Sequence, residues 1–72
     1  MSFYIYNYSR RKQIINRLLQ LNAVSKEKAV TFREAGIPEP RSVRDVMIIK
    51  GMFFQGVLYC DGDKYYLDTT KL

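Results

Sequence analysis

The sequence contains no histidine, no tryptophan and a single cysteine, Cys60. Histidine and cysteine supply most zinc ligands and many catalytic bases and nucleophiles, so their scarcity argues against a conventional zinc site and against catalysis. One cysteine cannot form a disulfide within the chain, and we interpret Cys60 as a small, half-buried residue in a reducing compartment. No apolar run reaches the roughly 18 residues that would span a bilayer. We therefore expect a soluble, cytoplasmic protein that is not an enzyme and needs no metal or other cofactor.

Glycine and proline are also scarce, with four and two residues. The glycines are spaced as helix stops and turns, and no cluster of them forms a phosphate-cradling loop. With only 72 residues, the chain is too short for a deep pocket in addition to a core. We expect no small-molecule substrate.

The composition otherwise indicates one folded domain, because 47% of the residues are hydrophobic. The formal net charge is +5, and ten of the twelve Lys and Arg residues lie in residues 1–50. A basic first part beside a nearly neutral last part suits contact with phosphate or with another anionic surface.

The last third of the chain predicts a β-hairpin. An apolar segment, 52–60, reaches the turn Asp61-Gly62-Asp63 and returns as Lys-Tyr-Tyr-Leu. Tyr, Val and Leu suit a half-buried strand, and Asp-Gly suits a tight hairpin turn. We place the hairpin at residues 57–69.

Residues 10–22 carry apolar side chains at helical spacing, at Ile14, Ile15, Leu18, Leu19 and Leu21. We predict a first helix there, with Ser9 as N-cap and Asn22 as a left-handed stop. The basic residues at its start would oppose the helix dipole, so we interpret them as contacts for a partner. The aromatic segment 1–9 has two interpretations, either an extended segment that pairs with the hairpin or a lead-in packed on the first helix.

Two further helices are predicted before the hairpin. Ser25 opens a short turn, and Thr31 and Glu34 match a capping box for a second helix at 31–35. A third helix starts near Arg41 and Ser42 and ends either at Lys50 or near Gln55-Gly56. The later end would place Asp45, Ile48, Ile49, Met52 and Phe53 on one face and Gly51 inside the helix, and we favour it because of the resemblance described next.

This order of elements, together with three segments, resembles small prokaryotic winged helix-turn-helix proteins. The segments are residues 23–37 (AVSKEKAVTFREAGI), 52–58 (MFFQGVL) and 61–68 (DGDKYYLD). The resemblance covers residues 10–69 and implies one winged-helix domain over 1–72, mainly helical, with a three-helix part at 10–56 and a C-terminal wing.

The resemblance also implies double-stranded DNA binding by a prokaryotic transcription regulator, with the third helix in the major groove. By position, the groove-facing residues are Ser42, Val43, Arg44, Val46, Met47 and Lys50. Arg44 would contact a guanine edge, and phosphate contacts would come from Arg10, Arg11, Arg41, Lys50 and Lys64.

Two features favour an alternative in which the winged helix docks or dimerises with protein and binds no DNA. The outward face of the third helix carries apolar residues, at Val43, Val46, Met47 and Phe54, and the wing carries Asp61 and Asp63. An outward apolar patch is typical of a protein interface. The partner would be a second copy or another protein, held by the third helix or by the N-terminal tyrosines. If the helix has a different phase, the apolar residues instead belong to the core.

A membrane-proximal role is a further alternative. Tyr4, Tyr6 and Tyr8 precede Arg10, Arg11 and Lys12, an order typical of the cytoplasmic side of a membrane segment. The simpler interpretation is that the tyrosines pack on the first helix and the basic residues are solvated.

Overall fold

The computed structural model describes residues 3–72, with side chains described from Arg10 onward. This part of the chain forms three α-helices and three strands, with two short 3₁₀ turns at Lys26–Lys28 and Thr69–Lys71. In chain order the main elements are α1 (Phe3–Gln20), β1 (Val30–Thr31), α2 (Phe32–Ala35), α3 (Val43–Phe54), β2 (Leu58–Asp61) and β3 (Lys64–Leu67).

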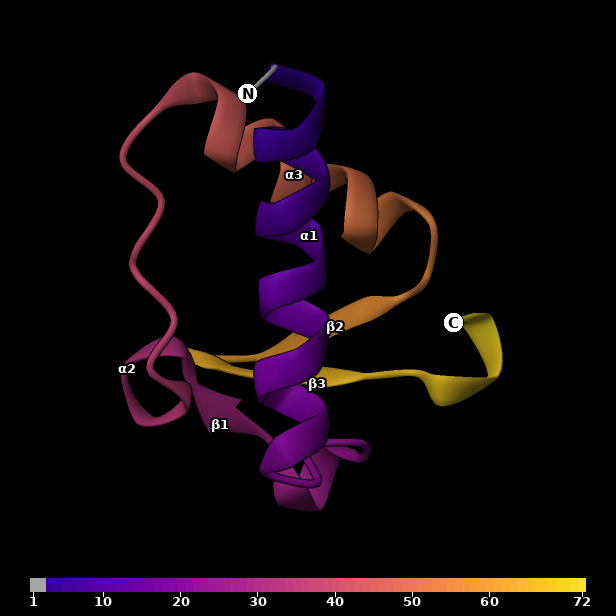
Figure 1. Ribbon diagram of the computed structural model, residues 1–72. Helices are drawn as coiled ribbons and strands as arrows, with labels where there is room; N and C mark the ends of the chain where they lie inside the picture. Colours follow the sequence, from indigo (N-terminus) through magenta and orange to yellow (C-terminus); the bar gives the residue numbers. More distant parts are fainter. Residues whose placement is uncertain (1–2) are drawn as a thin grey trace.

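The three strands form one antiparallel sheet in the order β1-β3-β2. Figure 1 shows α1 lying across one face of this sheet, with α3 beside the N-terminal half of α1. The predicted hairpin is confirmed, with Leu58 opposite Leu67 and Asp61 opposite Lys64. Gly62, the first of the two loop residues, has a φ of 66°, as a type II′ turn requires.

The third strand, β1, was not predicted. It has two residues, and it pairs Val30 with Tyr65 and Thr31 with Lys64. Two residues are too few to show an alternating pattern in the sequence, and their position is set by pairing with a strand more than thirty residues away. The fold is therefore a mixed one, rather than a helical bundle with an isolated hairpin.

A single core joins the helices to the sheet. It is built from apolar side chains of the three helices, of β2 and β3 and of the segments between elements, at Ile14, Leu18, Ala23, Phe32, Ala35, Ile37, Ile49, Met52, Val57, Leu58 and Leu67. Main-chain hydrogen bonds from Leu67 to Ala23 and from Asp68 to Val57, both 2.9 Å, hold β3 to the segments on either side of it. Burial of this apolar surface is the main stabilising contribution to the fold.

The start of the first helix was predicted wrongly. Helix α1 begins at Phe3 instead of after Ser9, so residues 3–8 are helical and do not form an extended segment. Once a helix exists, each residue added at its end gains one hydrogen bond, and Phe and Tyr are tolerated there. The basic residues at 10–12 therefore lie in the middle of the helix, away from the positive end of its dipole. A partner is no longer needed to explain their position. The end is as predicted, because Asn22 has a φ of 56°.

The other helix ends match their sequence signals. In α2, Thr31 Oγ1 accepts from the Glu34 amide at 3.0 Å, and Glu34 accepts from the Thr31 amide at 2.9 Å. In α3, Ser42 Oγ accepts from the Asp45 amide at 3.1 Å, and the helix runs to Phe54 with Gly51 inside it. The later of the two predicted ends is thus confirmed.

Candidate functional site

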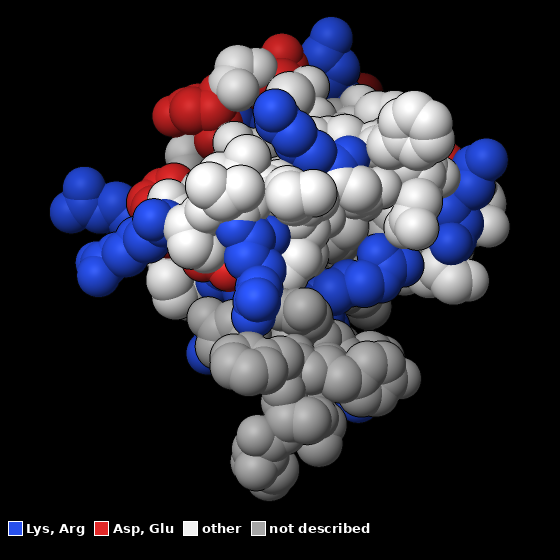
Figure 2. Space-filling view, turned by 90° about the horizontal axis from the view of Figure 1, so that it is seen from above, with Lys and Arg blue, Asp and Glu red and all other residues white. Residues whose placement is uncertain are grey.

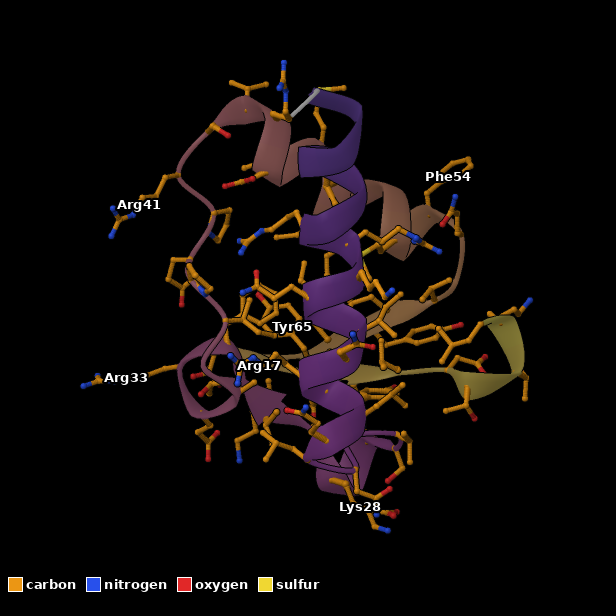
Figure 3. The ribbon with its side chains drawn as sticks, viewed as in Figure 1. Arg17, Lys28, Arg33, Arg41, Phe54 and Tyr65 are labelled. Carbon is orange, nitrogen blue, oxygen red and sulfur yellow. The ribbon has the colours of Figure 1, made fainter. Side chains whose placement is uncertain are left out.

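Helix α3 has a buried face and an exposed face. Ile49 and Met52 are buried, and Phe53 packs on the core with its ring centroid 6.2 Å from that of Tyr65. The next residue, Phe54, is 95% exposed, and Figure 3 shows its ring directed away from the molecule. The contrast between the two adjacent phenylalanines fixes the phase of the helix. The alternative phase, in which Val43, Met47 and Phe54 would belong to the core, is therefore wrong.

The exposed face of α3 carries four residues that we call the outer stripe: Val43, Met47, Lys50 and Phe54. They are spaced by four, three and four residues, which places them on one side of a helix. Val43 is 78% exposed and Met47 65% exposed, and Lys50 is also exposed. Val46, at 38%, lies at the border. The predicted outward apolar face is therefore confirmed.

Arg10, predicted as a phosphate contact, has a different position. Its side chain is only 8% exposed, and Nη2 donates to the Pro38 carbonyl oxygen at 2.7 Å. Nη1 donates to Gln13 Oε1 at 3.3 Å, and Nε lies 3.8 Å from Asp45 Oδ1. Arg10 thus joins α1 to the loop before α3 and to α3 itself, and its guanidinium does not face solvent. The sequence gives no signal of this pairing, since the two charged residues are 35 positions apart.

The other predicted DNA contacts lie at the surface but do not share one face. Arg41, Ser42, Arg44, Met47, Lys50 and Lys64 are all exposed. Arg11 is half-buried and donates to Gln55 Oε1 at 3.2 Å, next to Phe54. Lys64 lies on the hairpin, paired across the strands with Asp61 and with Thr31. The wing thus places carboxylates beside its one cation.

The charges around α3 are mostly positive. Figure 2 looks down on the end of the molecule that carries α3, and shows Lys and Arg side chains around uncharged surface, with most acidic side chains toward one side. Arg44 and Lys50 come from α3 itself, and Arg41 lies just before its N-cap Ser42 and points outward in Figure 3. The only carboxylate of α3, Asp45, is on the inner side, 13% exposed, beside Arg10. The outer stripe therefore includes one cation, Lys50, has a second cation, Arg44, beside it, and receives no acidic side chain from its own helix.

The basic run at 10–12 does not present three cations to one surface. Arg10 is buried, Arg11 is half-buried against Gln55, and Lys12 is exposed. No helix within residues 3–72 is both long enough and apolar enough to cross a membrane. The side chains of Tyr4, Tyr6 and Tyr8 lie outside the described residues, so their predicted packing or partner contacts are not described.

An open hollow of about 770 Å³ lies between α1, the loop 38–41 and the start of α3. Its lining carries both signs of charge, from Arg10, Gln13, Pro38, Glu39, Arg41, Ser42 and Asp45. The two buried charges, Arg10 and Asp45, lie against each other and balance. The hollow therefore selects neither an anion nor a cation.

Four other side chains have altered acidity or an unexpected environment, and one of them is Asp68, whose pKa is lowered by hydrogen bonds from Thr70. Hydrogen bonds from the Thr31 amide and hydroxyl lower the pKa of Glu34. Burial raises the pKa of Tyr65, whose ring packs against that of Phe32 at a centroid distance of 4.3 Å and a tilt of 31°. Cys60 is exposed on β2, so its predicted half-burial is wrong.

Among the residues that the structure describes, no three His, Cys, Asp or Glu side chains come together as metal ligands. Within the described part of the chain, the outer stripe is a surface feature that the fold leaves unexplained. In comparisons with known proteins, no family model, no characterised protein and no solved structure matches this chain.

Proposed function

We propose that the chain is a winged-helix domain whose function is to dock another protein through the outer stripe of α3. Support for the winged-helix assignment comes from the order of elements, α1-β1-α2-α3-β2-β3, and from the sheet order β1-β3-β2. The docking proposal rests on one observation: Val43, Met47 and Phe54 are 78%, 65% and 95% exposed on one face of a helix whose other face is buried.

Aromatic residues and methionine are enriched in protein interfaces, and hot spots are usually a few apolar anchors near the centre. Burying each of the three side chains would contribute roughly 1.5–3 kcal/mol. Their sum is of the same order as the cost of association, about 4–15 kcal/mol. The apolar anchors alone therefore give a weak complex, and other contacts must add to them.

Selection from a displayed library of helical peptides tests this proposal. Peptides enriched on the wild-type domain should bind Phe54→Glu at least tenfold more weakly, because a carboxylate would replace the most exposed anchor. The matched control is Leu19→Glu, which changes another exposed apolar residue (41%) on α1, away from the outer stripe. A library that yields no Phe54-dependent peptide would refute the proposal.

Double-stranded DNA binding is the second candidate function. It is favoured by the exposed cations Arg41, Arg44 and Lys50 at α3, the helix that enters the major groove in the proteins that the sequence resembles. Against it, the outward face of α3 carries Val43, Met47 and Phe54, for which DNA offers only thymine methyl groups as apolar contacts. Titration of a labelled duplex at low and high salt tests this function. Binding that weakens steeply with salt supports it, and absence of binding at low salt excludes it.

A further inference from the structure

The border of the outer stripe points to the chemistry of its partner. We infer that α3 docks an acidic amphipathic helix, with apolar residues on one side and Asp or Glu beside them. This inference rests on the proposed docking function and goes further, because it names the partner's charge and shape.

The first argument is charge complementarity. Lys50 lies on the outer stripe between Met47 and Phe54, and Arg44 lies three residues from Met47. Arg11 is held next to the end of the stripe by its hydrogen bond to Gln55. With Asp45 turned inward toward Arg10, α3 offers no carboxylate to a partner. Across an interface, complementary potentials favour the correct partner and like charges exclude the wrong one.

The second argument is the shape of the surface. Val43, Met47 and Phe54 form a straight row along a helix of twelve residues. A row with this spacing fits the matching row at i, i+4, i+7 and i+11 of another helix, so that the side chains of the two helices interdigitate. The acidic residues of such a partner would then lie beside its own apolar row, one flank facing Arg44 and both flanks within reach of the long Lys50 side chain.

A second copy of the chain fits this surface poorly. Pairing α3 with itself would bring Lys50 of both copies into one interface, and α3 has no acidic side chain on its exposed face. Each copy also carries a formal net charge of +5. Like-charge contact of this kind destabilises an interface, and the repulsion is strongest at low salt.

A matched pair of synthetic helical peptides tests the inference. Both carry Leu at i, i+4, i+7 and i+11, and they differ only in having Glu or Lys at the flanking positions. The Glu peptide should bind the wild-type domain at least tenfold more tightly than the Lys peptide, measured by fluorescence anisotropy at low salt. High salt should reduce this difference.

Charge reversal in the domain is the decisive control. Lys50→Glu should weaken binding of the Glu peptide about threefold or more and strengthen binding of the Lys peptide, without unfolding the domain, because Lys50 is exposed. If the variant binds the Lys peptide more tightly than the Glu peptide, the inference is supported. If the variant binds neither peptide, the inference is contradicted. Far-UV circular dichroism of the variant checks that it is folded.

The failures of the two proposals are distinguishable. If both peptides bind equally and both depend on Phe54, docking stands and the inference about charge is overturned. If neither peptide binds, the proposal of a docked helix is overturned. If sedimentation shows a dimer that Met47→Glu dissociates, the acidic partner is overturned in favour of a second copy. If duplex DNA competes with the Glu peptide and binds more tightly, the occupant is nucleic acid and the inference is overturned.

Discussion

Replacement of Arg10 with methionine gives the sharpest test of the structure. Methionine keeps most of the apolar length of the side chain but removes the guanidinium that joins α1 to the loop before α3. The change deletes the hydrogen bond to the Pro38 carbonyl oxygen at 2.7 Å and the one to Gln13 Oε1 at 3.3 Å. It also leaves the Asp45 carboxylate, 13% exposed, without its neighbouring positive charge.

The magnitude follows from burial. Removing one partner of a buried ion pair costs about 3–5 kcal/mol. Because the Arg10 Nε to Asp45 Oδ1 distance is 3.8 Å and the two atoms form no hydrogen bond, we take the lower end, about 3 kcal/mol. A domain of this size has a free energy of unfolding of roughly 4–11 kcal/mol, so this is a large fraction of it. The melting temperature should fall by about 12–24 °C.

Urea and thermal unfolding followed by circular dichroism measure this effect. The matched control is Arg41→Met, at an exposed arginine that lines the same hollow, and it should change the free energy of unfolding by less than about 0.5 kcal/mol. The double variant Arg10→Met with Asp45→Asn should be more stable than Arg10→Met alone, because the uncompensated charge is gone. Equal stabilities for the Arg10→Met and Arg41→Met variants would refute the buried position of Arg10.

Three other changes have definite expected outcomes. Gly51→Ala should raise the free energy of unfolding by about 1 kcal/mol, because Gly51 is inside α3 with open space where a Cβ would lie. Gly56→Ala should lower the free energy of unfolding by about 1–2 kcal/mol, because Gly56 has a φ of 74°. Chemical denaturation of both variants measures the two effects. Ser42→Ala should cost about 1 kcal/mol in the same assay, because the N-cap of α3 is lost. The pKa of Glu34 is lowered by hydrogen bonds from Thr31, so its contribution to stability is present above the ordinary value of 4.5 and lost as the pH falls through the lower folded value. Glu34→Gln keeps a side-chain oxygen that accepts from the Thr31 amide but removes the titrating carboxyl, so the free energy of unfolding should change less with pH in the acid range. The same pH dependence in the variant and the wild type would contradict the lowered pKa of Glu34.

Local signals in the sequence predicted the starts of α2 and α3, the end of each helix and the turn, but not the start of α1. Thr31 and Glu34, Ser42 and Asp45, and Gly62 each act within a few residues of themselves, so their hydrogen bonds and backbone angles follow from short segments. The outward face of α3 was also predictable, because helical periodicity relates Val43, Met47 and Phe54 to the core positions without knowledge of the neighbours.

Long-range pairings were not predictable from the single sequence. Strand β1 exists because two residues meet β3, and Arg10 is buried because the loop at Pro38 and the start of α3 surround it. An arginine in a basic run looks solvated in the sequence, since neither Asp45 nor the Pro38 carbonyl is near it in the chain. This is why a residue that stabilises the fold was predicted to contact phosphate.

Among the described residues, the outer stripe is a surface feature that the stability of this fold does not require. Phe53 stacks near Tyr65 and packs on the core, so its apolar character has a structural reason. Phe54 is 95% exposed and adds almost no buried surface, so changing it to Glu should alter the free energy of unfolding by less than about 0.5 kcal/mol. A phenylalanine, a methionine and a valine in one exposed row lower solubility without stabilising the monomer. Helix α3 is also held by its cap and by its packing on α1 and the sheet, so a partner that docks on it has little backbone to order. A rigid apolar row with cations along its border is what an interface for an acidic helix needs, and it is poorly suited to a surface that remains in water.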